Sequence, residues 1–273
     1  MIRAVIVGVT GRMGCALVRA AGETPDVRVA GAVASRSSSA LGRDAGELAG
    51  LGNIGVPVTS DLRAALADAD VAIDFSNAHA TASNLAVCRE ARKALLIGTT
   101  GFPDLAVNFD AASADIPLLV APNTSVGVAL LVELVRQAAK ALPATFDIEI
   151  MEAHHRGKRD APSGTAIALG NAAAAGRRGP DQLLTRTELS AARMGTPGPR
   201  PEGEIGFAVV RGGDIVGEHT VLFAGNGERL SFSHSATDRA IFARGALSAA
   251  RWLAARSAGR YEMRDFIGYK STA

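Results

Sequence analysis

The sequence predicts an α/β protein, with an N-terminal parallel-sheet domain and a smaller α+β domain that carries a mixed sheet. Three observations lead to this prediction. In the first half, short apolar runs alternate with helical patterns, which is the βαβ rhythm of a parallel sheet. In the second half, strand-like segments are joined by glycine-rich turns. The composition is 48% hydrophobic but only 4% aromatic, which suits close packing of helices on a sheet.

The first domain is predicted element by element. Five apolar runs are expected to form its strands, at residues 3–8, 27–34, 71–75, 94–98 and 117–121. Helical patterns fill the gaps at residues 13–21, 78–91 and 105–114, and a long apolar helix is expected at 126–142. Pro143 follows that helix and favours its end there.

The second domain is predicted from alternating segments at residues 145–152, 204–210, 219–223 and 229–234. Gly-Gly-Asp and Gly-Asn-Gly turns separate the last three segments, so a mixed or antiparallel sheet is expected. Residues 176–202 are rich in Gly, Pro and Arg without periodicity and predict an irregular connection or mobile flap. A helix is expected at 238–256. The predicted domains are 1–125, to which the C-terminal segment 236–273 returns, and 126–235.

Charge and cysteine content argue against several classes of partner. The formal net charge is +2 and the basic residues are scattered, so neither nucleic acid nor an anionic membrane surface is indicated. Cys15 and Cys88 lack the spacing of metal ligands, so free thiols and no metal site are expected. The N-terminus lacks a leader pattern, and no apolar run approaches the roughly 18 residues that span a bilayer. A cytoplasmic location is therefore expected.

A glycine motif follows the first predicted strand and opens the first helix. It reads Gly8-Val9-Thr10-Gly11-Arg12-Met13-Gly14. In such a motif Gly8 permits the tight turn, Gly11 lets the backbone approach a pyrophosphate, and Gly14 allows close packing of helix on strand. A merely tight turn is the alternative. The position in an N-terminal βαβ unit favours a dinucleotide-binding site.

The end of the second strand bears on the choice between NADH and NADPH. An acidic residue there usually binds the ribose 2′-hydroxyl of NAD. Here the segment reads Ala34-Ser35-Arg36-Ser37-Ser38. Arg36 without a neighbouring carboxylate suits a 2′-phosphate, so NADPH is favoured; an exposed polar loop is the alternative.

Polar residues also follow the third, fourth and fifth strands. Asp74 ends the third strand, Gly98-Thr99-Thr100-Gly101 follows the fourth, and Ala121-Pro122-Asn123-Thr124-Ser125 follows the fifth. Ligands of open α/β sheets bind at the carboxyl ends of strands, so these residues are candidates for cofactor contact. Ordinary loops and helix caps are the alternative interpretation.

Residues 152–166 hold the most concentrated set of reactive side chains. They read Glu152-Ala153-His154-His155-Arg156-Gly157-Lys158-Arg159-Asp160-Ala161-Pro162-Ser163-Gly164-Thr165-Ala166. Two histidines and a lysine can hold or deliver a proton, and Ser163-Gly164-Thr165 resembles a helix start that presents N–H groups to an anion. Each part alone has a structural explanation. Their occurrence together predicts an active site.

These residues together resemble the dihydrodipicolinate reductase family, also called 4-hydroxy-tetrahydrodipicolinate reductases, of the diaminopimelate and lysine pathway. The Glu-x-His-His-x-x-Lys-x-Asp-x-Pro-Ser-Gly-Thr pattern is specific to that family. The resemblance covers nearly the whole chain, at residues 8–14, 44–48, 98–102, 152–166, 213–220 and 263–265. It implies a Rossmann domain that binds NAD(P)H, a second domain that binds substrate and builds a homotetramer, and closure between them.

The resemblance also implies roles for single residues. His154 and Lys158 correspond to the proton-donating pair. The implied ligands of the dicarboxylate substrate are His155, Lys158, Ser163, Gly164 and Thr165. The implied cofactor contacts are Gly8, Val9, Thr10, Gly11, Arg12, Met13, Arg36, Gly98, Thr99, Thr100, Ala121, Pro122, Asn123 and Thr124. Two positions depart from the family: Ser35 stands where many members have Glu, and Thr124 where some have Phe.

The implied reaction fits these residue types. Loss of water from the substrate leaves a conjugated imine flanked by two carboxylates; it accepts a hydride from the nicotinamide on one carbon and a proton on another. A positioned acid accelerates such a step by ~10² to 10⁴-fold. Which of His154 and Lys158 delivers the proton stays open. Two alternatives remain as well: an amino acid or semialdehyde dehydrogenase of the L-aspartate dehydrogenase type, and a nonenzymatic NADP(H) sensor.

Overall fold

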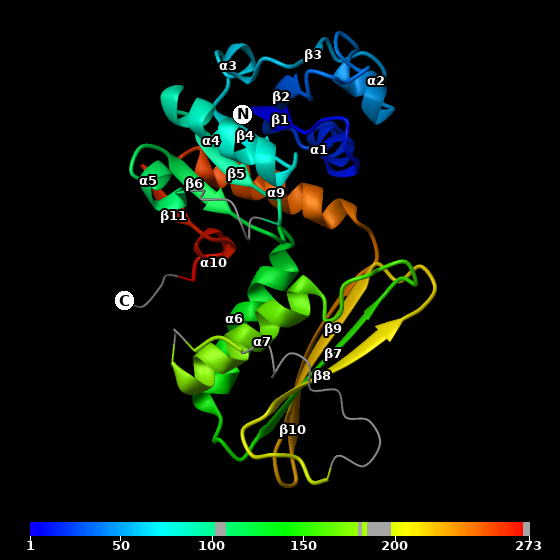
Figure 1. Ribbon diagram of the computed structural model, residues 1–273, viewed down its shortest axis with the longest axis vertical. Coiled ribbons are helices and arrows are strands. Elements are labelled where there is room, and N and C mark those ends of the chain that lie inside the picture. Colours follow the sequence, from blue (N-terminus) through cyan, green and yellow to red (C-terminus); the bar gives the residue numbers. More distant parts are fainter. Residues whose placement is uncertain (102–107, 180–181, 185–197, 270–273) are drawn as a thin grey trace. The chain divides into compact units, whose positions relative to one another are not determined.

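The computed structural model describes residues 1–101, 108–179, 182–184 and 198–269 (Figure 1). The chain folds into two compact units. Unit 1 comprises Met1–Val126 and Ala240–Ala273, and unit 2 comprises Gly127–Arg239. The C-terminal segment therefore belongs to the same unit as the N-terminal one.

Unit 1 contains a seven-stranded sheet in the order β11-β6-β5-β4-β1-β2-β3. Every strand pair in it is parallel. The strands are β1 (Ile2–Val7), β2 (Val27–Val33), β3 (Val58–Thr59), β4 (Val71–Asp74), β5 (Ala94–Ile97), β6 (Pro117–Val120) and β11 (Gly259–Tyr261). The α/β class and the parallel sheet predicted from the sequence are confirmed.

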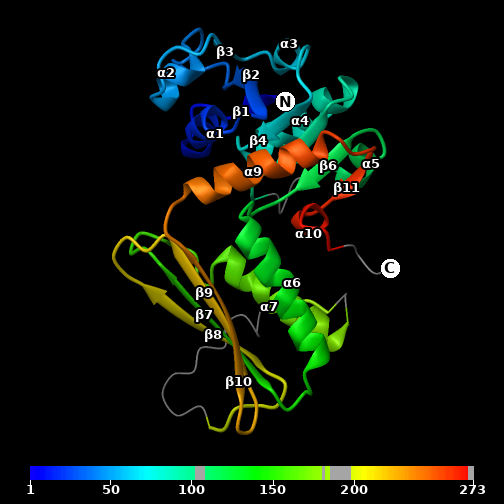
Figure 2. The ribbon, with the colours of Figure 1, turned by 180° about the vertical axis from the view of Figure 1, so that it is seen from behind.

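Helices cover both faces of this sheet. They are α1 (Arg12–Gly22), α2 (Ala45–Ala49), α3 (Leu62–Ala65), α4 (Ala78–Glu90), α5 (Phe109–Ser113), α9 (Ala240–Leu253) and α10 (Met263–Phe266). Helix α4 lies in front of the strands in Figure 1, whereas α9 lies in front in the opposite view of Figure 2. The central strands are therefore buried on both sides: Val5, Leu95 and Ile97 contact one helical layer, and neighbouring Ile6 and Leu96 are also fully buried. This double burial explains the unbroken apolar runs.

Unit 2 contains a four-stranded sheet in the order β10-β9-β7-β8. Its strands are β7 (Asp147–His154), β8 (Ile205–Arg211), β9 (Gly217–Ala224) and β10 (Arg229–Ala236). Strands β7 and β8 are parallel, and the other two pairs are antiparallel, so the sheet is mixed. Helices α6 (Val126–Ala141) and α7 (Gly164–Arg178) supply the other half of its core. Leu131 and Leu169 of these helices pack with Ile148, Ile150 and Phe223 of the sheet.

Among the described residues, five short elements were not predicted from the sequence: α2, β3, α3, β11 and α10. Helix α9 is also shorter at both ends than the predicted 238–256. Part of the predicted helix 105–114 and part of the predicted flap 176–202 lie outside the described residues; within the flap, residues 176–178 continue α7. None of the described helices is both long and apolar enough to cross a membrane.

Candidate active site

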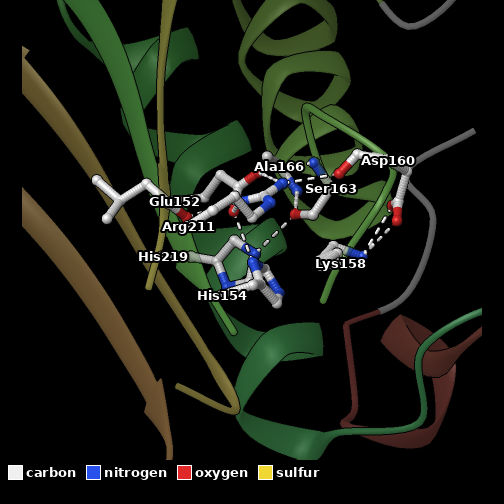
Figure 3. Close-up of polar contacts among 9 residues, drawn as sticks. Glu152, His154, Lys158, Asp160, Ser163, Ala166, Arg211 and His219 are labelled. Carbon is white, nitrogen blue, oxygen red and sulfur yellow. Dashed lines mark hydrogen bonds and ion pairs between the residues drawn. The ribbon is translucent and has the colours of Figure 1, made fainter. Parts of the chain in front are cut away.

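A polar cluster lies where β7, β8 and β9 meet the start of α7 in unit 2 (Figure 3). Side chains of a strand alternate between its two faces, so every second residue of β7 points the same way. Ile148 and Ile150 occupy the core-facing positions and are fully buried. Glu152 and His154 continue this row in the same register. One face of β7 therefore has two apolar side chains in the core, followed by a carboxylate and an imidazole at the edge of that core.

Glu152 is the centre of the cluster. Its side chain is 0% exposed. The Nη1 and Nη2 atoms of Arg211 donate to Oε2 and Oε1 at 2.8 Å each, a paired geometry that suits a carboxylate. The main-chain N–H of Ser163 donates to Oε1 at 3.0 Å. Burial opposes ionisation, but the hydrogen bonds from Arg211, His154 and Ser163 outweigh it and lower the pKa of Glu152.

His154 lies at the rim and is held by Glu152. Its Nδ1 atom is 2.6 Å from Oε2 of Glu152. Because an ionised carboxylate can only accept, Nδ1 carries the proton of this bond. Nε2 lies on the other side of the ring, beside Gly217, where an added Cβ would approach it to 3.1 Å. The imidazole can therefore take up or release a proton at Nε2.

The charge state of His154 follows from its surroundings. Burial lowers the pKa of His154, and the positive charges of Lys158 and Arg211 lower it further. The carboxylate of Glu152 raises it, but the net result is a lowered pKa. The ring of His219 packs edge-on against it, with centroids 5.1 Å apart. A neutral imidazole is thus the resting form, and an incoming anion would favour its protonation.

Ser163 joins the cluster to helix α7. Its Oγ accepts from the main-chain N–H of Ala166 at 3.1 Å and so caps the helix. The same Oγ lies 3.0 Å from Nε2 of His219. Burial, together with the charge of His154, lowers the pKa of His219 to about 4. His219 is therefore a neutral partner that fixes the helix start.

The first turn of α7 is open to a ligand. Gly164 is exposed, and a Cβ placed on it would meet nothing within 4 Å. Thr165 follows and is half-buried. The first N–H groups of a helix have no partner within the helix, and the helix dipole favours negative charge at this end. The arrangement suits a carboxylate.

Lys158 lies in the turn between β7 and α7. Its Nζ donates to both carboxylate oxygens of Asp160, at 2.9 and 2.8 Å. The turn is tied to the β8–β9 connection, because Gly212 N–H donates to His154 C=O at 2.9 Å and Arg156 N–H donates to Gly213 C=O at 3.2 Å. His155 is half-buried in the same turn.

The structure thus brings His154, Lys158 and Ser163 to one end of unit 2, as the sequence segment suggested. His154 is the last residue of β7 rather than a loop residue, because the strand extends two residues beyond the predicted 145–152. Sequence reasoning gave no role to Arg211 or His219. Arg211 follows two valines at the end of a strand and resembles an ordinary exposed charge. His219 had one signal, since strand alternation places it in the same row as the apolar Val221.

The glycine motif of unit 1 has the geometry of a phosphate-binding turn. Gly8 has φ of +82°, and a Cβ on Gly14 would lie 2.3 Å from the carbonyl oxygen of Gly8. Gly11 is the N-cap of α1, and no side chain caps that helix. Thr10 and Arg12 on either side of Gly11 are exposed, whereas Val9 is buried. The residues present therefore fit a dinucleotide pyrophosphate at the start of α1.

The remaining cofactor candidates differ in burial. The exposed ones are Arg36, Thr100 and Pro122, the half-buried ones are Met13 and Asn123, and Gly98 and Ala121 are buried. The two buried threonines use their side chains internally. Thr99 Oγ1 donates to the carbonyl of Asp74 at 3.3 Å, and Thr124 Oγ1 donates to that of Phe242 at 2.7 Å. No group of three or more potential metal ligands occurs among the described residues.

Comparison with known proteins covers the chain from end to end. The family model described as Dihydrodipicolinate reductase, N-terminus, matches residues 2–124, and the one described as Dihydrodipicolinate reductase, C-terminus, matches residues 127–267. The 4-hydroxy-tetrahydrodipicolinate reductase of Anaeromyxobacter sp. (strain Fw109-5) is 50% identical over 99% of both chains. That of Chromohalobacter salexigens is 49% identical, over 99% of this chain and 100% of its own.

Solved structures share the fold. The dipicolinate-bound dihydrodipicolinate reductase from Paenisporosarcina sp. TG-14 has a TM-score of 0.76 at 24% identity and covers 98% of this chain and 99% of its own. An amine dehydrogenase from Mycobacterium smegmatis has a TM-score of 0.59 at 17% identity, covering 95% and 94%. At these identities the likeness shows the architecture, whereas the two family models and the half-identical relatives carry the assignment.

Proposed function

The chain belongs to the dihydrodipicolinate reductase family, and we propose that the cluster around Glu152 is where it binds and protonates its substrate. The family assignment makes it an NAD(P)H-dependent oxidoreductase that reduces 4-hydroxy-tetrahydrodipicolinate in diaminopimelate and lysine biosynthesis. This family assignment excludes the two alternatives, an amino acid or semialdehyde dehydrogenase and a nonenzymatic NADP(H) sensor. The observation that carries the proposal is His154, which a buried carboxylate holds at Nδ1 and whose side chain is 12% exposed.

The proposed chemistry needs one hydride and one proton. The nicotinamide, when bound, supplies the hydride to one carbon of the conjugated imine. The electron pair displaced toward nitrogen then returns through the enamine to the adjacent carbon, which takes the proton. His154 delivers this proton from Nε2, and Lys158 contributes positive charge close by. Glu152 keeps Nδ1 protonated, so that the ring presents the same nitrogen in each turnover.

We assign the substrate carboxylates to the start of α7 and the turn before it. The ligands are His155, Lys158, Ser163, Gly164 and Thr165. Gly164 supports this assignment most directly, because the space beside it is open on a helix end that favours anions. Asp160 accepts two of the three N–H donors of the Lys158 ammonium group, and the third would bind the substrate. The Paenisporosarcina reductase is named as bound to dipicolinate, a planar ring that carries two carboxylates like the proposed substrate.

We assign the cofactor to the carboxyl ends of the strands in unit 1. The proposed contacts are Gly8, Val9, Thr10, Gly11, Arg12, Met13, Arg36, Gly98, Thr99, Thr100, Ala121, Pro122, Asn123 and Thr124. The side chains of Thr99 and Thr124 already bond within the unit, so their main-chain atoms would make the contact. Exposed Arg36, with Ser35 in place of an acid, favours NADPH over NADH.

The division of labour and the assembly complete the proposal. Residues 1–125 with 236–273 would bind the cofactor, and residues 126–235 would bind substrate and form the contacts of a homotetramer in the cytoplasm. Sedimentation of the purified chain tests the assembly, with four times the mass of one chain as the expected result. Neither nucleic acid nor membrane enters the reaction.

Turnover tests the function directly. Fresh dihydrodipicolinate is added to the purified protein with NADPH, and loss of absorbance at the nicotinamide band is followed. Substrate-dependent oxidation of NADPH is expected, with no oxidation when L-aspartate or aspartate semialdehyde replaces the cyclic substrate. Absence of oxidation with the cyclic substrate would remove the proposal.

A further inference from the structure

Arg211 is the one arginine whose described contacts reach both sides of the site. Its paired bonds to Glu152 come from Nη1 and Nη2 at 2.8 Å. Nη2 also donates to the main-chain oxygen of Asp160 at 2.7 Å, and Nη1 donates to that of Val210 at 2.8 Å. The guanidinium thus spans from the last strand residues to the turn that carries Lys158.

Each end of this bridge holds one of the two residues that the proposed function assigns to the proton transfer, His154 as the donor and Lys158 as the nearby positive charge. Glu152 bonds to Nδ1 of His154, and the carboxylate of Asp160 bonds to Nζ of Lys158. His154 and Lys158 lie four residues apart. Main-chain hydrogen bonds from Lys158 N–H to His155 C=O and from Arg156 N–H to Gly213 C=O hold the backbone of the turn between them. The bond from Arg211 to the Asp160 carbonyl adds a tie to the residue that binds the Lys158 side chain.

We propose that Arg211 is a positioning residue that sets the placement of Lys158 relative to His154 by clamping Glu152 and the main chain of Asp160 together. Arg211 touches neither substrate nor cofactor in this role. The inference rests on the proposed function, because that function assigns His154 and Lys158 their parts in the proton transfer.

Lysine cannot reproduce this clamp. A guanidinium presents its donors in a rigid plane, which matches two carboxylate oxygens and leaves further donors for the Asp160 carbonyl. An ammonium group satisfies a point charge without that plane. Arg211→Lys therefore keeps the charge that stabilises the buried Glu152 but loses the geometry. Arg211→Met loses both.

The charge of Arg211 also acts on His154. The charged and titratable groups facing this imidazole are Glu152 on its own strand, Arg211 on β8, His219 on β9 and Lys158 in the turn. His234 on β10 pairs with His219 and so lies one strand further from His154. Arg211 and Lys158 lower the pKa of His154, so removal of the arginine charge raises it. A proton donor with a raised pKa stays protonated to higher pH.

The experiment compares full-length Arg211→Lys and Arg211→Met with the wild-type protein. The profile of kcat against pH, the KM for dihydrodipicolinate, the Kd for NADPH and the melting temperature are measured for each. Arg229→Met is the matched control, because Arg229 is an exposed arginine on β10 of the same sheet. It is expected to keep the wild-type profile.

Both Arg211 variants are expected to lose about tenfold or more in kcat with NADPH affinity within about twofold of wild type. The basic limb of the profile should move up by about half a pH unit or more in Arg211→Met and stay in place in Arg211→Lys. Wild-type kcat in Arg211→Lys would overturn the inference. So would a loss of kcat in which NADPH affinity falls in parallel, or an unshifted limb in a folded Arg211→Met. If Arg211→Met does not fold, the test rests on Arg211→Lys alone: a loss of kcat with NADPH affinity retained supports the inference, and wild-type kcat overturns it.

These outcomes separate the inference from the function on which it rests. Retention of turnover by His154→Gln and Lys158→Met would remove the proposed roles of both residues in the proton transfer, and with them the need for a clamp. Inactive His154 and Lys158 variants combined with normal Arg211 variants would remove the inference alone.

Discussion

The Nδ1 atom of His154 lies 2.6 Å from Oε2 of Glu152, two residues earlier on the same face of β7. This spacing turns a strand's alternation into a functional device, because the residue that would otherwise continue the apolar row becomes the orienting carboxylate. Glu152 is fully buried and ionised, whereas the ring of His154 reaches the rim. In the proposed function, Glu152 orients the ring and His154 exchanges the proton, so one strand supplies both side chains.

Substrate binding at the start of α7 predicts unequal effects at two adjacent residues. Thr165→Val keeps the shape of the side chain but removes a hydroxyl contact to an anion, which costs roughly 1.5 to 3 kcal/mol, or about tenfold to a hundredfold in affinity. Gly164→Val should weaken binding more, because its side chain fills the space left for the carboxylate. Calorimetric titration with pyridine-2,6-dicarboxylate measures both.

The protein itself has room for the new side chain at Gly164. The melting temperature of Gly164→Val should therefore match that of wild type, which separates lost binding from lost folding. Binding of the dicarboxylate by Thr165→Val as tightly as by wild type would contradict the assignment.

Cofactor choice is predicted from the loop after β2. NADPH should be used at least as well as NADH, because no carboxylate at Ser35 repels a 2′-phosphate and exposed Arg36 can pair with it. Arg36→Ala should reduce kcat/KM for NADPH while leaving that for NADH nearly unchanged. Ser35→Glu should shift the preference toward NADH. A preference of wild type for NADH above about tenfold, or unchanged NADPH binding in Arg36→Ala, would refute this interpretation.

Stability should fall as the solution becomes acidic, in part because of His219. Its folded-state pKa of about 4 lies below its ordinary value of 6.5, so between these values the unfolded chain binds more protons than the folded one. Stability then rises with pH through this window, by at most about 1.4 kcal/mol per pH unit for one proton. His219→Gln should have a smaller drop in melting temperature between pH 7 and pH 5 than wild type.

His154 and His234 also have lowered pKa values and act in the same direction, so both proteins should keep some slope. Exposed His79 on α4 offers a control, since His79→Gln removes a side chain that loses little hydration on folding. An equal slope in wild type and His219→Gln would show that His219 has no part in acid sensitivity.

The parallel sheet was predictable because its central strands are buried on both faces. Residues 4–7 of β1, 71–73 of β4 and 94–97 of β5 are therefore continuous apolar runs, which the sequence displays without any knowledge of their neighbours. β11 was not predictable, since three residues give no periodicity and Gly259–Tyr261 pair only with distant β6. Helix α2 depends on tertiary contacts too: the carboxylate of Asp44 accepts from the N–H groups of Gly46, Ile54 and Val56.

The site residues also fall into those that the sequence revealed and those that only the fold brings in. His154, Lys158 and Ser163 were visible because they lie in one segment whose residue types have a joint chemical meaning. Arg211 and His219 come from β8 and β9 and lie 59 and 56 residues along the chain from their partners Glu152 and Ser163. Sheet register places them, as in the pairing of Glu152 with His219 across β7 and β9. Register depends on the partner strand as well as on the strand itself, so one segment read alone does not reveal it.

The most direct test of the account is single-turnover oxidation of NADPH by wild type, His154→Gln and Lys158→Met, with dihydrodipicolinate in excess. Each variant should lose about a hundredfold or more in rate, since general acids contribute ~10² to 10⁴-fold, while the Kd for NADPH stays within about twofold of wild type. Such a result would place the proton donor in the cluster held by Glu152. A His154 variant that keeps more than about a tenth of the wild-type rate would contradict its assignment as the proton donor, and a Lys158 variant that does so would contradict its proposed part in the proton transfer.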